Sequence, residues 1–233
     1  MLFRQLFDSE SFTYTYLLAD ESSGDAALID PVREQIERDL RVLRELGLTL
    51  RYALDTHVHA DHITAAGDLR ERTGASTVSC VTGGADCASV HLGHGGELRI
   101  GGLLLRALAT PGHTDDSLSF LVDDCVFTGD ALLIRGCGRT DFQNGAPGQL
   151  YDSVTKVLFA LPDSTRVYPA HDYSGQTMTT IAEERRYNPR LAGKSREEFI
   201  ALMNNLRLAP PKKLHVAVPA NRACGKDPLP QGV

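Results

Sequence analysis

Residues 56–62 read THVHADH, which places three imidazoles and one carboxylate within six residues. The segment follows Leu50–Asp55, which has the composition of a buried strand, and it precedes a helix-like segment, 64–73. In an extended loop, residues two apart project to the same side, so His57 and His59 can reach one point. Such side chains at the end of a strand predict a metal site at the edge of a β-sheet.

Three further ligand-type residues follow other predicted strands. His113 lies in TPGHT after LRALAT, Asp130 ends FTGD after CVF, and His171 lies in YPAHD after RVY. One histidine in such a loop is more often an ordinary polar residue. Ligand-type residues after four strands instead predict that these strands end at one edge of the structure, where their side chains meet at a metal.

The remaining segments alternate between strand-like and helix-like patterns. Aromatic residues alternate with Ser and Thr at 11–16, as in a half-buried strand, and apolar residues at 36–46 have helical spacing. We therefore predict one α/β domain, residues 1–233, with two mixed β-sheets packed face to face and helices outside. A short tail rich in Pro and Gly, 210–233, is predicted to be irregular.

The composition excludes some partners. A formal net charge of −6 argues against nucleic acid and anionic membrane surfaces, which both select a basic face. No apolar segment approaches the roughly 20 residues of a membrane helix. The N-terminal segment has neither the pattern of a signal peptide nor room for a transit peptide, and the five cysteines contain no CxxC pair. We therefore predict reduced thiols and a cytoplasmic location.

The ligand-type residues alone leave two metal centres open. All seven could hold two ions bridged by Asp130, with a hydroxide nucleophile for hydrolysis. Alternatively, His57, His113 and Asp130 could hold one ferrous ion, because two imidazoles and one carboxylate form the facial triad of non-haem oxygenases.

The order of THVHADH, PGHT, TGD and PAHD resembles the metal-binding motifs of the metallo-β-lactamase superfamily. The resemblance implies an αββα sandwich, two mixed β-sheets with helices on the outer faces and the metal site at one edge. This fold supports hydrolases, nucleases and redox enzymes, so it does not decide the reaction.

Residues 129–143, GDALLIRGCGRTDFQ, resemble the signature of the persulfide dioxygenases, the ethylmalonic encephalopathy protein family. ALIDPV, EERRYNPRL and VPANRACG extend the resemblance over nearly the whole chain. It implies an iron oxidoreductase that converts glutathione persulfide, O2 and water to sulfite and glutathione. One Fe(II) per chain would be held by His57, His113 and Asp130. The alternative is a binuclear hydroxyacylglutathione hydrolase of the glyoxalase II type.

On this interpretation, four residues support the ligands through hydrogen bonds, although a second metal near some of them stays open: His59, Asp61, His62 and His171. Arg139, Tyr173 and Arg222 are candidates for binding glutathione, since arginine grips carboxylates in bidentate fashion and Tyr173 offers a phenol. Cys137 is interpreted as a small residue in a tight turn. Relatives of this family are often dimeric, which leaves a homodimer open.

Overall fold

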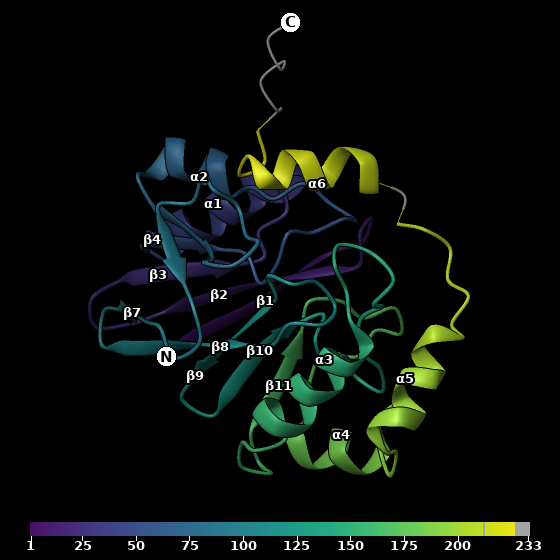
Figure 1. Cartoon of the computed structure of the whole chain (residues 1–233). Coiled ribbons are helices and arrows are strands. Elements are labelled where there is room, and N and C mark those ends of the chain that lie inside the picture. The colour runs from purple at the N-terminus through teal and green to yellow at the C-terminus, as the bar shows by residue number, and fades with distance from the viewer. Residues whose placement is uncertain (212, 227–233) are drawn as a thin grey trace, which may run out of the picture. The chain divides into compact units, whose positions relative to one another are not determined.

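The computed structural model describes residues 1–211 and 213–226. These residues form two six-stranded β-sheets and six α-helices (Figure 1). The chain divides into two compact units. Unit 1 comprises Met1–Leu92, Leu98–Leu104 and Pro210–Val233, and unit 2 comprises Gly93–Glu97 and Leu105–Ala209.

The first sheet lies in unit 1 and has the strand order β1-β2-β3-β4-β5-β6. Its first three strands are antiparallel neighbours, whereas β3, β4, β5 and β6 run parallel. Parallel neighbours need long crossover connections, and α1 and α2 lie in two of them. The strands are β1 (Leu2–Asp8), β2 (Thr13–Ala19), β3 (Asp25–Ile29), β4 (Thr49–Leu54), β5 (Ser76–Cys80) and β6 (Val90–Leu92).

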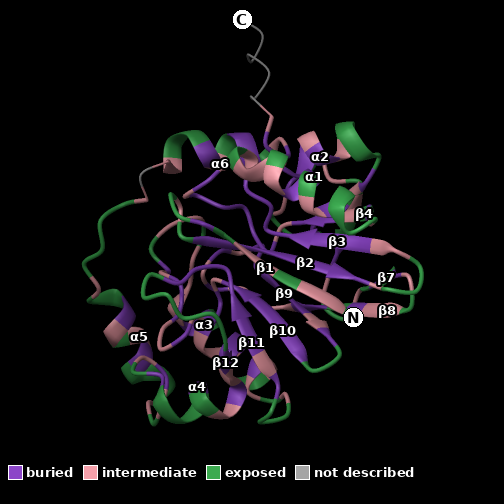
Figure 2. Ribbon diagram, turned by 180° about the vertical axis from the view of Figure 1, so that it is seen from behind, coloured by how far each residue is buried: buried purple, intermediate pink, exposed green. Residues whose placement is uncertain are grey.

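Helices of unit 1 pack an apolar stripe against this sheet. Helix α1 (Ile36–Glu45), preceded by the 3₁₀ turn η1 (Arg33–Gln35), buries Leu40 and Leu43. They join Leu17 and Leu28 of β2 and β3, together with Leu69 of α2 (Ala66–Thr73), in one core cluster. Figure 2 shows β2 and β3 as almost wholly buried.

The second sheet has the order β12-β11-β10-β9-β8-β7. Within it β10 and β11 are parallel, and the pairs β8–β9, β9–β10 and β11–β12 are antiparallel. The helices of unit 2 share a core with β10 and β11 that includes Val126, Val167 and Phe199. The strands are β7 (Glu97–Ile100), β8 (Leu103–Ala109), β9 (Leu118–Val122), β10 (Cys125–Gly129), β11 (Arg166–Pro169) and β12 (Thr179–Thr180). The helices are α3 (Pro147–Asp152), its π-helical continuation η2 (Ser153–Leu158), α4 (Ile181–Tyr187) and α5 (Arg196–Asn204).

The prediction of two mixed sheets with helices is confirmed. No helix among the described residues has both the length and the apolar composition needed to cross a membrane. The patterns did not predict β5 and β6, because short strands carry too few alternating residues to stand out.

The prediction of an irregular tail is wrong for helix α6 (Leu214–Arg222). Pro219 lies inside this helix, but buried Ala217 and Ala220 show that packing overrides the low propensity of proline. Within unit 1, α6 lies beside α2 (Figure 1). Residues 212 and 227–233 of the tail lie outside the described residues. A single domain spanning 1–233 stays a prediction.

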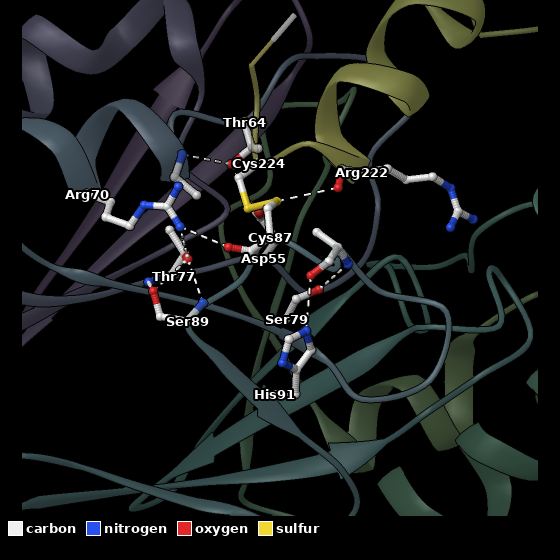
Figure 3. Close-up of a disulfide and its surroundings, with 12 residues drawn as sticks. Asp55, Thr64, Arg70, Thr77, Ser79, Cys87, Ser89, His91, Arg222 and Cys224 are labelled. Carbon is white, nitrogen blue, oxygen red and sulfur yellow. Dashed lines mark hydrogen bonds between the residues drawn. A yellow bond between two sulfur atoms is a disulfide. The ribbon is translucent and has the colours of Figure 1, made fainter. Parts of the chain in front are cut away.

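The prediction that all cysteines are reduced is also wrong, because Cys87 and Cys224 form a disulfide (Figure 3). The two residues are 137 positions apart, and their pairing depends on the tail returning to the loop after β5. Nothing in their local sequence indicates this contact. Cys125 and Cys137 are buried thiols.

Candidate metal centre

The metal loop, residues 55–62, begins where β4 ends and is anchored by Asp30. Because β3 and β4 are parallel neighbours, the buried Asp30 after β3 lies at the same sheet edge as the loop. Asp30 Oδ1 accepts from the Thr56 amide at 2.7 Å, and Oδ2 accepts from the Thr56 hydroxyl at 3.0 Å. His59 Nε2 lies 3.0 Å from Oδ1. One carboxylate thus fixes both the start and the middle of the loop.

Three histidine rings of the loop are buried and lie in a row. The ring centroids of His57 and His59 are 4.1 Å apart, and those of His59 and His62 are 4.3 Å apart. Ligand atoms of His59, Asp61 and His62 lie within 4.8 Å of one another. The structure therefore brings together the side chains that the motif singled out in this unit.

His59 is paired with a charge. Burial by itself lowers the pKa of His59, but the charge of Asp30 and its hydrogen bond outweigh burial and raise the pKa to about 9. Asp61 and Asp55 add to this effect. The raised pKa favours the protonated ring, so the contact with Asp30 ties His59 to the start of the loop.

Asp61 and His62 form a second contact at the end of the metal loop. His62 Nδ1 lies 3.1 Å from Asp61 Oδ2. The Thr13 hydroxyl of β2 lies 3.3 Å from both of these atoms. Another strand of the same sheet thus orients both side chains.

Asn221 of α6 is a residue of this site that sequence reasoning missed. Its side-chain amide is buried and forms hydrogen bonds with the backbone of residues 59–64. The motif VPANRACG contains Asn221, but the motif marked family resemblance without indicating a role. Only the return of the tail to this loop reveals the role.

In unit 2, three predicted residues come together at the ends of β8, β10 and β11. His171 Nδ1 lies 2.7 Å from Asp130 Oδ1, and His113 Nε2 lies 3.5 Å from Asp130 Oδ2. The parallel pairing of β10 with β11 explains the first contact, since Gly129 is the register partner of Pro169. Asp130 thus offers one oxygen to His171 and the other toward His113.

Hydrogen bonds determine the tautomers of both predicted histidine ligands. A carbonyl oxygen can only accept, so His113 Nδ1 donates to the Arg139 carbonyl, 2.7 Å away. Similarly, Thr56 gives its one hydroxyl hydrogen to Asp30, so His57 Nδ1 must donate to the Thr56 hydroxyl oxygen, 3.0 Å away. Both imidazoles therefore carry their lone pair on Nε2, the atom available for a metal.

Gly138 makes close packing around His113 possible. A Cβ at this position would lie 2.7 Å from His113 Nδ1 and 2.5 Å from the Asp130 carbonyl oxygen. The Gly138 amide donates to that carbonyl at 2.7 Å. The glycine of GCGR therefore serves the approach of the chain to His113 and Asp130, beyond the tight turn that the sequence predicted.

Arg139, predicted to bind substrate, already has partners in unit 2. Its guanidinium forms a bidentate pair with Asp141 at 2.7 and 2.8 Å, and it donates to the Ala209 carbonyl at 2.6 Å. It also lies 4.5 Å from the ring centroid of Phe142. The structure places Arg139 next to His113 through its carbonyl, while its side chain links two surface segments.

The other predicted substrate residues have different settings. Tyr173 is 68% exposed, and its ring stacks on His171 with centroids 6.2 Å apart. Arg222 is exposed in the last turn of α6, where Nη1 reaches the Gly83 carbonyl at 3.5 Å.

Burial raises the pKa of the Cys137 thiol to about 11, so this thiol stays protonated at neutral pH.

Comparison with known proteins places the chain in a family. A family model described as the metallo-beta-lactamase superfamily matches residues 9–87 and 88–171. The chain is 51% identical to the protein named persulfide dioxygenase ETHE1, mitochondrial, from Mus musculus, over 97% of this chain and 89% of the mouse protein. It belongs to the persulfide dioxygenase family. The crystal structure of ETHE1 from Myxococcus xanthus is 66% identical, with a TM-score of 0.95 and coverage of 97% of this chain and 100% of that chain.

The fold class and the family resemblance predicted from the sequence are therefore confirmed. The superfamily model spans all seven ligand-type residues, whereas Tyr173 and Arg222 lie beyond it. A hydroxyacylglutathione hydrolase from a Bradyrhizobium strain is 37% identical over 75% of this chain and 68% of the hydrolase. The hydrolase similarity is weaker and shorter than the persulfide dioxygenase similarity.

Proposed function

We propose that this chain is a glutathione-dependent persulfide dioxygenase, which oxidises glutathione persulfide with O2 and water to sulfite and glutathione. The outer sulfur loses four electrons to dioxygen, its bond to the inner sulfur breaks, and water supplies the third oxygen of sulfite. The observation that carries the proposal is the similarity to the mouse persulfide dioxygenase along almost the entire chain.

We propose one Fe(II) per chain, held by Nε2 of His57, Nε2 of His113 and Oδ2 of Asp130. Two imidazoles and one carboxylate are the donor set that non-haem ferrous oxygenases use. Each proposed ligand is oriented through its other polar atom, as metal ligands generally are. When bound, ferrous iron supplies the redox chemistry between dioxygen and a sulfur ligand.

The neighbouring residues keep these ligands in place. We assign His171 to hold Asp130, and His59 to couple the metal loop to Asp30. Asp61 and His62 support each other and the end of the loop. Together these contacts fix tautomer and orientation, which raises the basicity of the ligands.

For glutathione, we propose contacts from Arg139, Tyr173 and Arg222. A glutathione carboxylate would have to replace Asp141 as the partner of Arg139. Tyr173 presents an exposed phenol beside His171, which suits a hydrogen bond to the peptide part of the substrate. Arg222 offers an exposed guanidinium on α6.

The test is a metal analysis beside two assays on the same preparation. About one iron per chain, with oxygen uptake on glutathione persulfide, supports the proposal. Two metal ions per chain, with hydrolysis of S-lactoylglutathione and no oxygen uptake, would replace it by the hydrolase alternative. A zinc-loaded, iron-free preparation should consume no oxygen, since zinc has no redox chemistry.

Location and assembly complete the proposal. We propose a cytoplasmic enzyme, although the mouse relative is named as mitochondrial. Cell fractionation with an antibody against the chain tests this directly. A homodimer would elute at about twice the monomer mass of 25.3 kDa in size-exclusion chromatography with light scattering.

A further inference from the structure

The C-terminal segment 221–226 lies in direct contact with the metal loop and the residues that follow it. The Asn221 side chain donates from Nδ2 to the His59 carbonyl at 2.9 Å and to the His62 carbonyl at 2.8 Å. Asn221 Oδ1 accepts from the Thr64 amide at 2.8 Å. Two carbonyls and one amide match only one orientation of a carboxamide, so these contacts define how Asn221 is placed.

Asn221 is suited to this position by its chemistry. It is 3% exposed, and His59, His62 and Thr64 are even more deeply buried, so water cannot replace the lost hydrogen bonds. A leucine has similar size but no polar atoms. An aspartate keeps the acceptor for Thr64 but places a second oxygen against two carbonyls.

The surrounding backbone leaves Asn221 little freedom to move away. The Gly67 amide donates to the Cys224 carbonyl at 2.9 Å, and a Cβ on Gly225 would lie 2.0 Å from the Thr64 carbonyl oxygen. The disulfide from Cys224 to Cys87 adds a covalent link to the same unit (Figure 3). The side-chain amide of Asn221 therefore projects toward the loop from a backbone segment that has little freedom to move.

We propose that Asn221 is a positioning residue for the metal loop and, through the loop's backbone, for the proposed iron ligand His57. By holding the carbonyls of His59 and His62 and the amide of Thr64, it sets the backbone from which the loop's histidines project. Loss of these hydrogen bonds should weaken metal binding and slow catalysis while leaving substrate affinity alone. The inference rests on the proposed function, because it takes this loop to carry a ligand of the catalytic metal.

The experiment compares Asn221→Asp and Asn221→Leu with two controls. Asn205→Asp changes an exposed asparagine at the end of α5 that donates to one carbonyl. Ala217→Gly weakens α6 at a buried position without touching the loop's hydrogen bonds. Cobalt(II) affinity is measured by chelator competition, the cobalt absorption spectrum reports ligand geometry, and thermal melting of the apoprotein reports stability.

We expect both Asn221 variants to bind cobalt about 10–100-fold more weakly than wild type, with an altered cobalt spectrum. At saturating iron, kcat should fall while KM for glutathione persulfide stays constant. Both controls should keep wild-type cobalt affinity, even though Ala217→Gly melts at a lower temperature. If Asn221→Leu does not fold, the comparison is decided by Asn221→Asp, which retains the Thr64 hydrogen bond.

Unchanged cobalt affinity and spectrum in Asn221→Asp, with melting lowered as in Ala217→Gly, would overturn the inference and leave Asn221 a stabilising residue only. The cobalt measurements need no persulfide. If wild type failed to oxidise persulfide yet the Asn221 variants lost cobalt, the proposed function would fail and the positioning role would stand.

Discussion

In unit 1 the metal loop is held by three other segments of the chain, whereas in unit 2 two ligand-type residues hold each other and the third is held by a nearby backbone carbonyl. Asp30 after β3, Thr13 of β2 and Asn221 of α6 all form hydrogen bonds with the loop. In unit 2, by contrast, Asp130 is held by the predicted site residue His171, and His113 by a backbone carbonyl.

Strand geometry accounts for this difference. In unit 2 the residues lie at the ends of separate strands, and the parallel register of β10 and β11 is sufficient to place Asp130 beside His171. In unit 1 all the motif residues lie in one loop after one strand, so the sheet fixes only where the loop starts. Its shape must come from hydrogen bonds with distant segments.

The largest expected effect is the same in both units, because it removes a proposed iron ligand. His57→Ala in unit 1 and His113→Ala or Asp130→Ala in unit 2 should each reduce iron and oxygen uptake to background, since two remaining ligands form too weak a chelate. His62→Ala should keep most of its iron and lose activity about 10–100-fold. Iron per chain is measured on each purified variant. Equal iron loss in His62→Ala would show that His62 is a ligand and would favour the binuclear alternative.

Removal of a supporting side chain should lower the free energy of unfolding more in unit 1 than in unit 2. Asp30→Ala removes the acceptor of Thr56 and leaves His59 without its buried counter-charge, so the free energy of unfolding should fall by about 3–5 kcal/mol. His171→Ala removes one hydrogen bond to Asp130 and should cost about 1.5–3 kcal/mol. Urea unfolding of the metal-free variants measures both. Equal losses would mean that the loop of unit 1 needs no more support than the strand ends of unit 2.

Loss of the disulfide should reduce the stability of unit 1 only. Replacing Cys87 by Ser removes the link to Cys224 and should lower the free energy of unfolding by about 2–4 kcal/mol, typical of a disulfide that closes a long loop. Amide hydrogen exchange should become faster in 56–67 and 214–226 and stay constant in 105–209. Adding a reductant to wild type should reproduce this pattern and should leave Cys87→Ser unchanged. Faster exchange throughout 105–209 would contradict a local role.

The sequence indicated candidate site residues through short motifs, but it did not indicate the contacts that orient them. His57, His113 and Asp130 lie in short motifs that follow predicted strands, so the sequence alone predicted their positions near strand ends. Asn221 and the Cys87–Cys224 disulfide depend on a tail that returns to residues 59–87, and no local pattern encodes that return. Helix α6 was missed for the same reason. Pro219 argues against a helix in the sequence, and only the burial of Ala217 and Ala220 in the folded chain favours one.

Arg139 shows a different limit of prediction. The residue type and its place after the metal motif indicated carboxylate binding, and a carboxylate is indeed bound to it, but that carboxylate is Asp141 of the same chain. Sequence cannot distinguish a guanidinium poised for substrate from one that already has an internal partner. The two roles differ in what happens when that partner is removed.

The smallest expected effect therefore concerns Arg139. If Arg139 binds glutathione persulfide, Arg139→Ala should lower kcat/KM about ten- to a hundredfold through KM, because a charge-assisted hydrogen bond contributes roughly 1.5–3 kcal/mol. Iron should stay near normal, since the Arg139 carbonyl that holds His113 is unchanged. Arg139→Lys should recover only part of the loss, because a point charge cannot reproduce a planar fork.

Asp141→Ala is the matched variant that separates substrate binding from internal pairing. It removes the competing carboxylate, so a substrate-binding Arg139 should give an unchanged or lower KM. If Arg139 instead only ties the segment around Ala209 to its own loop, both Arg139→Ala and Asp141→Ala should lower the melting temperature and leave KM at the wild-type value. Steady-state kinetics with glutathione persulfide and thermal melting of the same preparations distinguish the two outcomes. In the second case the segment that carries Arg139, like the metal loop of unit 1, would prove to be held by a distant segment of the chain.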